Sequence, residues 1–496
     1  MTLFGPGGLL LMAALVVAPE GPESVQTPPH GLAAVGGVPG DPAVDLSNNG
    51  GPTSTDPSDA GGDELGGAET QHDSEARLPE PVDAGPMAAR AESVTWPTGA
   101  HPSFSWAGMT FTARGFAQVD AVLLSQASYD ELNASTGQPL NERSISLRRL
   151  RVRAEVSRWI FSAAAELEAS TVGGLSLRPY AAELAVRWPA TGEVPLVKLS
   201  GGLVCMPFGR DVRLAVAEPL DRFFFEPSTM ARALFPGSFD LGIRLSGGWR
   251  FLRYEFAVMN GEPVGELGLP AKDPNAAKDF MGRLGFVTPP SVVTLKAGVS
   301  GLWGVGFHPG TPSTKDTLAW HDANEDGQVQ STELQVVGGL PSTPSKDFDR
   351  FALGADLELA VAIPVLGTLA ITGELVWAKN LDRALFVADP VALGRDTREV
   401  GWVVGLTQQL PWGFALGVRF DRYLPDADAA DQEGAVRVPF DSSLSTWSFV
   451  AAWRWQRTAR LLVQYEHQRN ALGRGLDGTP TTLGSDRLAI RAEVAF

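Results

Sequence analysis

Cysteine is almost absent from this sequence of 496 residues, in which Cys205 is the only one. A single cysteine excludes a disulfide framework and a cysteine-rich zinc module, and we interpret Cys205 as an inert rather than a reactive thiol. A basic surplus is also missing, since the net charge is −17, and this argues against a nucleic-acid partner. The apolar run at residues 8–18 is too short to span a bilayer as a helix.

The acidity is concentrated in the N-terminal part of the chain. Residues 1–100 contain fourteen acidic and two basic side chains, a net charge of −12, so the other 396 residues carry only −5. The apolar run ends on small residues and predicts a signal peptide over 1–18, although no Lys or Arg precedes it. Residues 19–103 are rich in Gly, Pro, Asp, Ser and Ala, which predicts a disordered acidic linker. A spacer that reaches toward the cell wall is the functional alternative.

From residue 104 to residue 496, apolar and polar side chains alternate in segments of about ten residues. This period of two predicts strands, with apolar side chains toward lipid and polar ones toward a lumen. We predict an all-β fold, a transmembrane antiparallel β-barrel of about 16 strands preceded by the disordered segment. The predicted strands are 108–124, 145–157, 160–170, 178–188, 196–204, 238–247, 250–259, 278–287, 292–306, 350–362, 367–378, 398–410, 413–424, 444–456, 459–469 and 483–496.

Tight connections alternate with long loops between these segments. Trp159, Trp188, Trp249 and Trp412 all stand at tight connections. Short turns on one side and long loops on the other are typical of an outer-membrane barrel. The four tryptophans therefore predict an aromatic girdle at one membrane interface, whereas tryptophans of a soluble core would not favour one class of turn.

The last segment alternates Leu488, Ile490 and Val494 with polar or small residues and ends on Phe496. An aromatic residue at the end of such a strand resembles the signal that barrel-assembly machinery binds. We therefore expect this machinery and outer-membrane lipid as partners, and the bacterial outer membrane as the location. A soluble β-sandwich would have to bury the arginine-rich faces, which is costly.

Charged side chains on the polar faces are candidates for lining a pore. Opposed basic and acidic rows filter solutes by charge; the alternative is that they pair with one another and keep the lumen hydrated. The candidates are Arg114, Arg149, Arg151, Arg153, Glu166, Glu168, Lys198 and Arg244.

The segment 205–237 is too apolar for an ordinary solvated loop. Apolar loops need cover, which the lumen offers, so we predict a constriction; an interface with neighbouring protomers is the alternative. Its candidate residues are Pro207, Phe208, Arg210, Asp211 and Arg213.

A second loop matches a twelve-residue EF-hand-type calcium loop at every required position, from 322 to 333. Proline and glycine on both sides argue against paired flanking helices, so we expect a structural Ca²⁺ that staples a loop. A solvated acidic turn is the alternative. The predicted ligands are Asp322, Asn324, Asp326, Gln328 through its carbonyl, Gln330 directly or through water, and Glu333.

Motifs for catalysis are missing: there is no nucleotide loop, nucleophile elbow or metal-hydrolase helix, and His308 and His321 stand apart from triad partners in the sequence. We therefore expect no enzyme. A lipase-like or protease-like barrel is the alternative, because catalytic residues need not be neighbours in sequence.

Three stretches resemble the phosphate-selective porin O and P family: Arg-Arg-Leu-Arg-Val-Arg-Ala-Glu at 148–155, Pro-Phe-Gly-Arg-Asp at 207–211 and Val-Met-Asn-Gly at 258–261. The resemblance covers roughly 105–496 and is strongest from 145 to 262. It implies a sixteen-stranded porin, commonly trimeric, that carries small anions. Val204-Cys205-Met206 stands where the family often has a Gln or Lys pair.

These observations predict a porin for the passive diffusion of small hydrophilic solutes, with anions such as phosphate as candidates, assembled as a homotrimer. The rival prediction is a non-conducting barrel that displays a calcium-stapled surface loop for adhesion or assembly.

Overall fold

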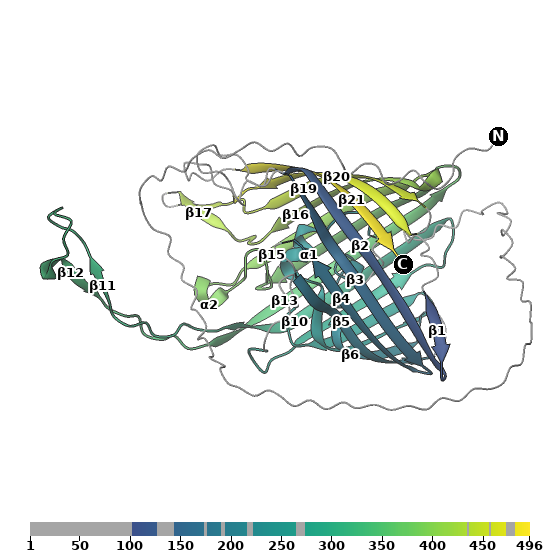
Figure 1. Cartoon of the computed structure of the whole chain (residues 1–496), viewed down its shortest axis with the longest axis horizontal. Coiled ribbons are helices and arrows are strands. Elements are labelled where there is room, and N and C mark those ends of the chain that lie inside the picture. Colours follow the sequence, from purple (N-terminus) through teal and green to yellow (C-terminus); the bar gives the residue numbers. More distant parts are fainter. Residues whose placement is uncertain are drawn as a thin grey trace, which may run out of the picture. The chain divides into compact units, whose positions relative to one another are not determined.

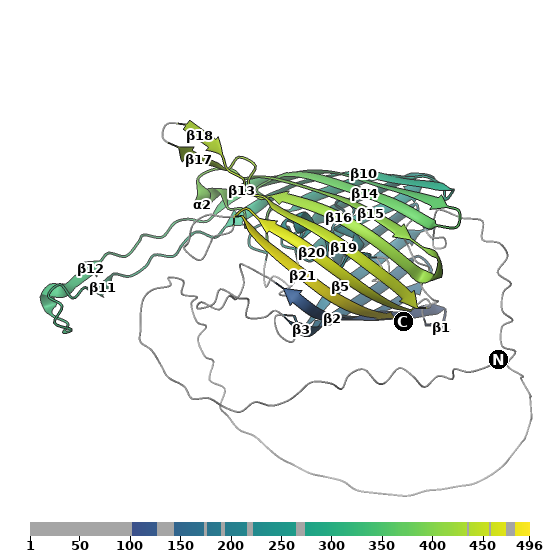
Figure 2. The same cartoon turned by 90° about the horizontal axis from the view of Figure 1, so that it is seen from above.

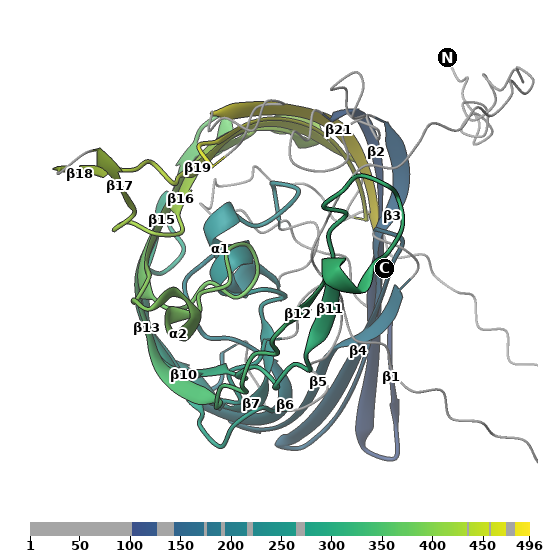
Figure 3. The same cartoon turned by 90° about the vertical axis from the view of Figure 1, so that its left-hand side faces the viewer.

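The computed structural model describes residues 102–125, 143–172, 176–189, 194–215, 222–263, 273–433, 436–455, 458–472 and 482–496. The signal peptide and all but the last two residues of the linker predicted above lie outside these ranges. Within them, sixteen antiparallel strands form one closed barrel, because β2 pairs with β3 on one side and with β21 on the other. The predicted barrel is therefore confirmed (Figures 1 and 3).

The barrel strands follow the predicted segments closely. The largest difference is at β13, the tenth strand of the barrel, which begins at Lys346 instead of residue 350. The strands are β2 (Met109–Ser125), β3 (Ser144–Arg158), β4 (Phe161–Ser170), β5 (Ser176–Trp188), β6 (Val197–Cys205), β7 (Phe239–Trp249), β8 (Leu252–Met259), β9 (Asp279–Val287), β10 (Val293–His308), β13 (Lys346–Ile363), β14 (Gly367–Lys379), β15 (Arg398–Gln409), β16 (Phe414–Leu424), β19 (Leu444–Trp455), β20 (Ala459–Asn470) and β21 (Leu483–Ala495).

The remaining elements are short. In the described residues, β11 (Thr317–Trp320) pairs with β12 (Leu334–Val337), and β17 (Ala430–Glu433) pairs with β18 (Val436–Pro439). The two α-helices of this part of the chain are α1 (Thr229–Leu234) and α2 (Pro390–Leu393). No helix among the described residues is long and apolar enough to cross a membrane.

The seam of the barrel lies where the chain ends. The amide and carbonyl of Phe496 exchange hydrogen bonds of 2.9 Å with Gly115 of β2. The first residues of β2, Met109–Thr112, are not paired by β21. They lie opposite β1 (Ser103–Trp106) instead. The short first strand thus covers the stretch of β2 that β21 does not reach (Figure 1).

The two ends of the barrel differ. Short turns join β3 to β4, β7 to β8 and β13 to β14, whereas the long connection 309–345 extends from the opposite end (Figure 2). The predicted girdle residues Trp159, Trp188, Trp249 and Trp412 stand at short turns and are 56–87% exposed. The long-loop end of such a barrel is the extracellular one.

The strands place apolar side chains outside and charged ones inside. Leu353, Leu375 and Leu416 face outward and are about half exposed, whereas Asp120, Arg491 and Glu493 face inward and are at most 2% exposed. In a closed barrel every strand satisfies its backbone hydrogen bonds with its neighbours. The apolar exterior can then face lipid. The chain is therefore a bacterial outer-membrane barrel, and any functional site lies within its charged interior or on its loops.

Candidate functional site: the charged lumen and the inner loop

The described residues of the connection between β6 and β7, 206–215 and 222–238, lie inside the barrel, and we call this connection the inner loop (Figure 3). Its helix α1 buries Met230, Ala233 and Leu234 against inward residues of β8–β16. Phe208 is fully buried and stacks on Phe235 with ring centroids 4.5 Å apart. An apolar loop folded into the barrel in this way occupies part of the lumen.

The first anchor of the inner loop is on the β10–β14 side of the barrel. Gly209, with a positive φ of 55°, lets the chain turn so that the amides of Arg210 and Asp211 donate to one carboxylate oxygen of Glu374 on β14, at 3.1 and 2.8 Å. The Arg210 guanidinium binds Glu358 of β13 at 2.9 Å. Pro207 is buried in the turn. The Pro-Phe-Gly-Arg-Asp stretch is therefore an attachment point for the loop.

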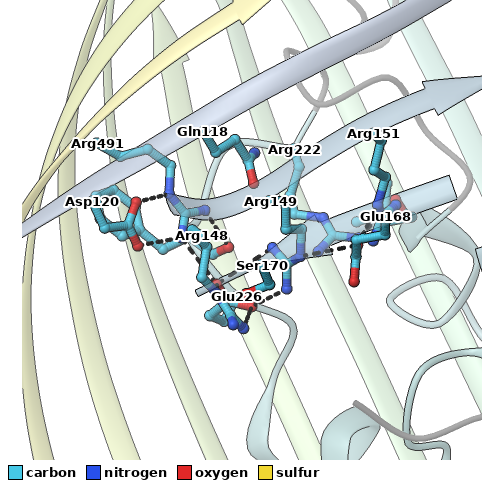
Figure 4. Close-up of polar contacts among 12 residues, drawn as sticks. Gln118, Asp120, Arg148, Arg149, Arg151, Glu168, Ser170, Arg222, Glu226 and Arg491 are labelled. Atoms are coloured by element: carbon cyan, nitrogen blue, oxygen red, sulfur yellow. Dashed lines mark hydrogen bonds and ion pairs between the residues drawn. The ribbon is translucent and has the colours of Figure 1, made fainter. Parts of the chain in front are cut away.

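The second anchor is Glu226, on the opposite side of the lumen (Figure 4). Arg148 binds its carboxylate with two hydrogen bonds of 2.8 and 3.1 Å, Arg149 donates at 2.7 Å and Arg491 at 3.0 Å. Burial alone raises the pKa of Glu226, but these guanidinium groups outweigh burial and hold it well below its usual range. One loop carboxylate thus ties the inner loop to β3 and β21.

A β-bulge explains how two consecutive arginines reach the same carboxylate. In the pairing of β2 with β3, Gln118 lies opposite Arg149 and Val119 opposite Leu147, so Arg148 is the extra residue. A bulge redirects one side chain against the alternation of the strand. Arg148, which the period of two would point toward lipid, turns into the lumen beside Arg149.

The arginine row on β3 is largely paired. Arg151 donates to Glu168 at 2.5 Å and lies 3.3 Å from the ring centre of Tyr180, and Arg153 contacts Glu166 at 3.5 Å. Glu168 also binds Arg178 at 2.6 Å and is only 3% exposed. The structure therefore brings the predicted rows of arginines and glutamates together as ion pairs.

The other predicted lumen residues also face inward. Lys198 pairs with Glu183, and Arg244 donates to the carbonyl of Cys205 at 3.2 Å. Arg114 lies opposite Arg153 in the β2–β3 pairing. On the inner loop, Arg213 binds Glu255 of β8 at 2.6 Å and Asp211 accepts from the Ser228 amide at 2.6 Å.

A cavity of about 130 Å³ remains inside the barrel beside the inner loop. Among the residues that line it, the side chain of Arg222 donates to the carbonyl of Leu214 and forms no ion pair with any described carboxylate. Burial, and then the neighbouring guanidinium of Arg149, lower the pKa of Arg222 to about 10, so the group stays charged at neutral pH. Arg419 lies over the ring of Phe224 at 4.7 Å on the same cavity.

Several of these residues were not among the sequence candidates. Arg491 and Glu374 lie on strand faces that the alternation had already identified as polar. A list of candidates that took the inward-facing charges of every strand would have included them. Arg148, Arg222 and Glu226 carry no such signal, because a bulge and a loop conformation place them.

The calcium-type loop lies at the tip of the connection between β10 and β13, between β11 and β12, and the flanks are strands instead of helices, in line with the expectation of no paired helices. Asp322 accepts from the Asp326 and Gly327 amides, and Glu333 accepts from Ala323 and Gln330. Gly327 has a φ of 73°, which permits the bend. Among the described residues, no three His, Cys, Asp or Glu side chains converge as a metal site. The predicted ligands Asn324, Gln328 and Gln330 are not of these four residue types.

The histidine His308 has a partner that sequence spacing did not suggest. Its Nδ1 lies 2.6 Å from Oδ2 of Asp389, which caps α2 by accepting from the Val391 and Ala392 amides. His467 pairs with Asp486 in the same way at 2.6 Å. In the described part of the chain, neither ring is hydrogen-bonded to a serine, threonine or cysteine.

No family model matches the sequence, and no curated protein matches it. Solved structures of outer-membrane barrels are similar to it. The outer-membrane channel DcaP of Acinetobacter baumannii is 11% identical over 79% of this chain and 99% of its own, with a TM-score of 0.48. The anion-selective porin of Comamonas acidovorans is 10% identical over 78% and 100%, with a TM-score of 0.47. The trimer form of OmpT from Vibrio cholerae is 11% identical over 78% and 100%, with a TM-score of 0.45.

Proposed function

We propose that this barrel is a porin that lets small hydrophilic solutes diffuse passively across the outer membrane. The observation that carries the proposal is the inner loop, which is held at Glu374 on one side of the lumen and at Glu226 on the other. A loop fixed between charged walls narrows a channel without filling the barrel, and charged walls favour hydrated solutes.

Purified protein in a planar bilayer tests this function. Stepwise conductance from a barrel that still shows the mobility shift on heating supports a pore. A folded barrel that inserts into the bilayer but gives no stepwise conductance would contradict the porin proposal and favour the non-conducting alternative.

We infer further that the pore favours small anions, phosphate among them, as the resemblance to the porin O and P family implies. Arg222 on the cavity supports this preference, since its side chain forms no ion pair with a carboxylate among the described residues. The paired state of Arg149, Arg151 and Arg153 argues that this row contributes less to selectivity than to the structure of the wall.

We also propose a homotrimer, insertion by barrel-assembly machinery through the strand that ends at Phe496, and no enzymatic activity. Asp389 already caps α2, which gives the His308 pair a structural role.

We propose that residues 322–333 bind one structural Ca²⁺ through Asp322, Asn324, Asp326, the Gln328 carbonyl, Gln330 and Glu333. The pre-bent loop between two paired strands supports this, and it also favours the second function, a barrel that displays a stapled loop outside the cell.

The calcium proposal predicts that chelation makes the connection 309–345 easier to cleave with protease. Asp322→Ala combined with Glu333→Ala should give the same cleavage with or without calcium, while Asp316→Ala, outside the twelve positions, should behave as the parent. Cleavage of the parent that does not respond to calcium would end the proposal.

A further inference from the structure

Three basic side chains lie on the outer face of the barrel, at the long-loop ends of β14, β15 and β16. Lys379 follows the exposed Trp377 at the second position along β14, and Arg398 of β15 lies directly opposite Lys379. Arg422 of β16 lies directly opposite Trp402 of β15. Residues two apart, or directly opposite, share a face of a sheet. We call these three side chains, which are 39–46% exposed, the outer basic cluster.

Aromatic side chains lie next to the outer basic cluster, on the side toward the middle of the barrel. The rings of Trp402 and Phe420 are 5.0 Å apart, and those of Phe420 and Trp447 are 4.7 Å apart. Aromatic residues of this kind lie at the level of lipid headgroups. Farther along the same strands, the outward residues are aliphatic and about half exposed: Leu375, Val404 and Leu416. From the loops inward, the outer face is therefore basic, then aromatic, then aliphatic.

The strand β20 repeats this order. Its outward residues are Arg469 at the long-loop end, then Tyr465 and Val463, which are 37% and 39% exposed. The strands β3 and β5 differ, because their outward residues near the long loops include Ile145 and Leu177, at 81% and 73% exposure. The basic outer surface thus belongs to one side of the barrel and is not a property of every strand end.

Each member of the outer basic cluster is paired with an aspartate of a nearby loop. The pairs, at 2.7, 2.5 and 3.4 Å, are Lys379 with Asp396, Arg398 with Asp428, and Arg422 with Asp441. The three aspartate side chains are 51–61% exposed, and exposed pairs of this kind contribute little stability. A phosphate binds a guanidinium with two parallel hydrogen bonds. It can therefore replace a loop carboxylate without leaving a buried charge.

We propose that Lys379, Arg398 and Arg422 bind the phosphate groups of a phosphorylated glycolipid in the outer leaflet of the membrane. The acyl chains of this lipid would lie along the aliphatic residues of β14–β16. The position favours a lipid over a free ion, because the three side chains face away from the lumen and border the aromatic level. The inference rests on the location in the outer membrane and is independent of conduction.

Native mass spectrometry of the full chain in detergent, titrated with lipid A that carries two phosphates, tests this site. The parent should bind the lipid, and the combined Lys379→Gln, Arg398→Gln and Arg422→Gln variant should bind it at least about tenfold more weakly. The heat-dependent mobility shift shows that the variant folds. Equal affinity of the parent and this variant would overturn the proposal.

The matched control removes outward basic residues at the opposite end of the barrel. Arg158 and Arg250 lie over the rings of Trp159 and Trp249, at 4.8 and 5.0 Å. Arg158→Gln combined with Arg250→Gln should leave the affinity for lipid A unchanged. If this control loses as much affinity as the triple variant, the binding reflects overall charge and the proposed site is wrong.

Two further titrations identify the ligand. Lipid A without phosphates should bind the parent as weakly as the triple variant binds the phosphorylated form, and millimolar inorganic phosphate should not displace the phosphorylated lipid. Equal binding of both lipids would contradict recognition of phosphate, and displacement by inorganic phosphate would show a site for free anions instead. Conductance of the triple variant keeps this question apart from the pore, since loss of the lipid alone leaves the porin proposal intact.

Discussion

Glu226 is an acidic residue with a side chain only 14% exposed, and it holds the inner loop to three arginines. Its carboxylate contacts Arg148, Arg149 and Arg491, and Arg419 donates to its backbone carbonyl at 2.8 Å. Removing one partner from a buried ion pair leaves the other charge uncompensated, which costs about 3–5 kcal/mol. Here three guanidinium groups would lose one shared carboxylate.

We therefore expect Glu226→Gln to loosen the inner loop, seen as faster proteolysis within 206–238 and as current noise in single channels. Glu155→Gln is the matched control, because Glu155 on β3 is 41% exposed and lies 3.8 Å from Arg153. An exposed pair contributes at most about 1 kcal/mol. Equal behaviour of the two variants would contradict the role of Glu226.

The lowered pKa of Glu226 gives a pH prediction with a definite sign. A carboxyl with a depressed native pKa stabilises the fold above the unfolded value of about 4.3, and this contribution is lost as the pH falls through the native value. Channel noise should therefore stay constant between about pH 8 and pH 5 and rise only below that range. A rise in noise already near neutral pH would contradict the lowered pKa.

Gly115 is required by the end of the chain. A Cβ at this position would lie 2.5 Å from the Phe496 ring and 2.7 Å from the Arg151 carbonyl oxygen. Gly115→Ala must displace the last residue from its pairing on β2, at a cost of about 1–3 kcal/mol. We expect less heat-modifiable barrel in membranes. Gly484→Ala on β21, where nothing lies within 4 Å of an added Cβ, should fold as the parent does.

At the residue scale, sequence reasoning reached the charges that regular strands place. The period of two predicts that Arg149, Arg151 and Arg153 face the lumen. Glu166 and Glu168 lie on the neighbouring strand, opposite this row. Arg148 was out of reach, since one extra residue in β3 reverses its direction without any change in composition. Which carboxylate each arginine binds depends on the inner loop, whose conformation has no period.

The inner loop is an element with its own apolar core. Leu234 of α1 is fully buried, beside Met230 and Phe235, against the barrel wall. Leu→Ala at such a site costs about 2–5 kcal/mol. We expect Leu234→Ala to expose the loop to protease while the barrel keeps its heat-dependent mobility shift.

The control is Arg232→Ala, because Arg232 lies on the exposed side of the same helix. If Leu234→Ala unfolds the whole barrel, the loop and the wall form one cooperative unit, which contradicts the prediction. Loss of the loop alone would show that the wall is stable by its strand pairing.

Elements with a clear period were predictable and short ones were not. The sixteen barrel strands alternate over nine residues or more in most cases, whereas β1, β11, β12, β17 and β18 have four residues each, too few for a period to be seen. The hairpin of β11 and β12 depends on pairing across the calcium-type loop. Chain topology was predictable because short turns and long loops alternate along the sequence.

At the scale of the whole molecule, the proposed anion preference depends on the charges of the lumen. Acidic and basic groups on the inner wall mostly neutralise each other, as in the pairs of Arg151 with Glu168 and of Arg460 with Glu493. A pore lined by paired charges carries little net field. The proposed selectivity therefore rests on groups that line the cavity without a carboxylate in contact, of which Arg222 is the clearest among the described residues.

Arg222→Gln should therefore shift the reversal potential in asymmetric KCl toward cation preference, with little change in folded yield. The reason is that Gln keeps a hydrogen-bond donor for the Leu214 carbonyl but removes the positive charge from the cavity. Lys379→Gln is the matched control, since Lys379 at the end of β14 is 40% exposed and paired with Asp396. Charges in a low-dielectric cavity act on a permeating ion far more strongly than exposed, screened ones. A parent protein that prefers cations would refute the anion preference. Equal shifts of the reversal potential for the two variants would show that Arg222 does not determine the charge selectivity.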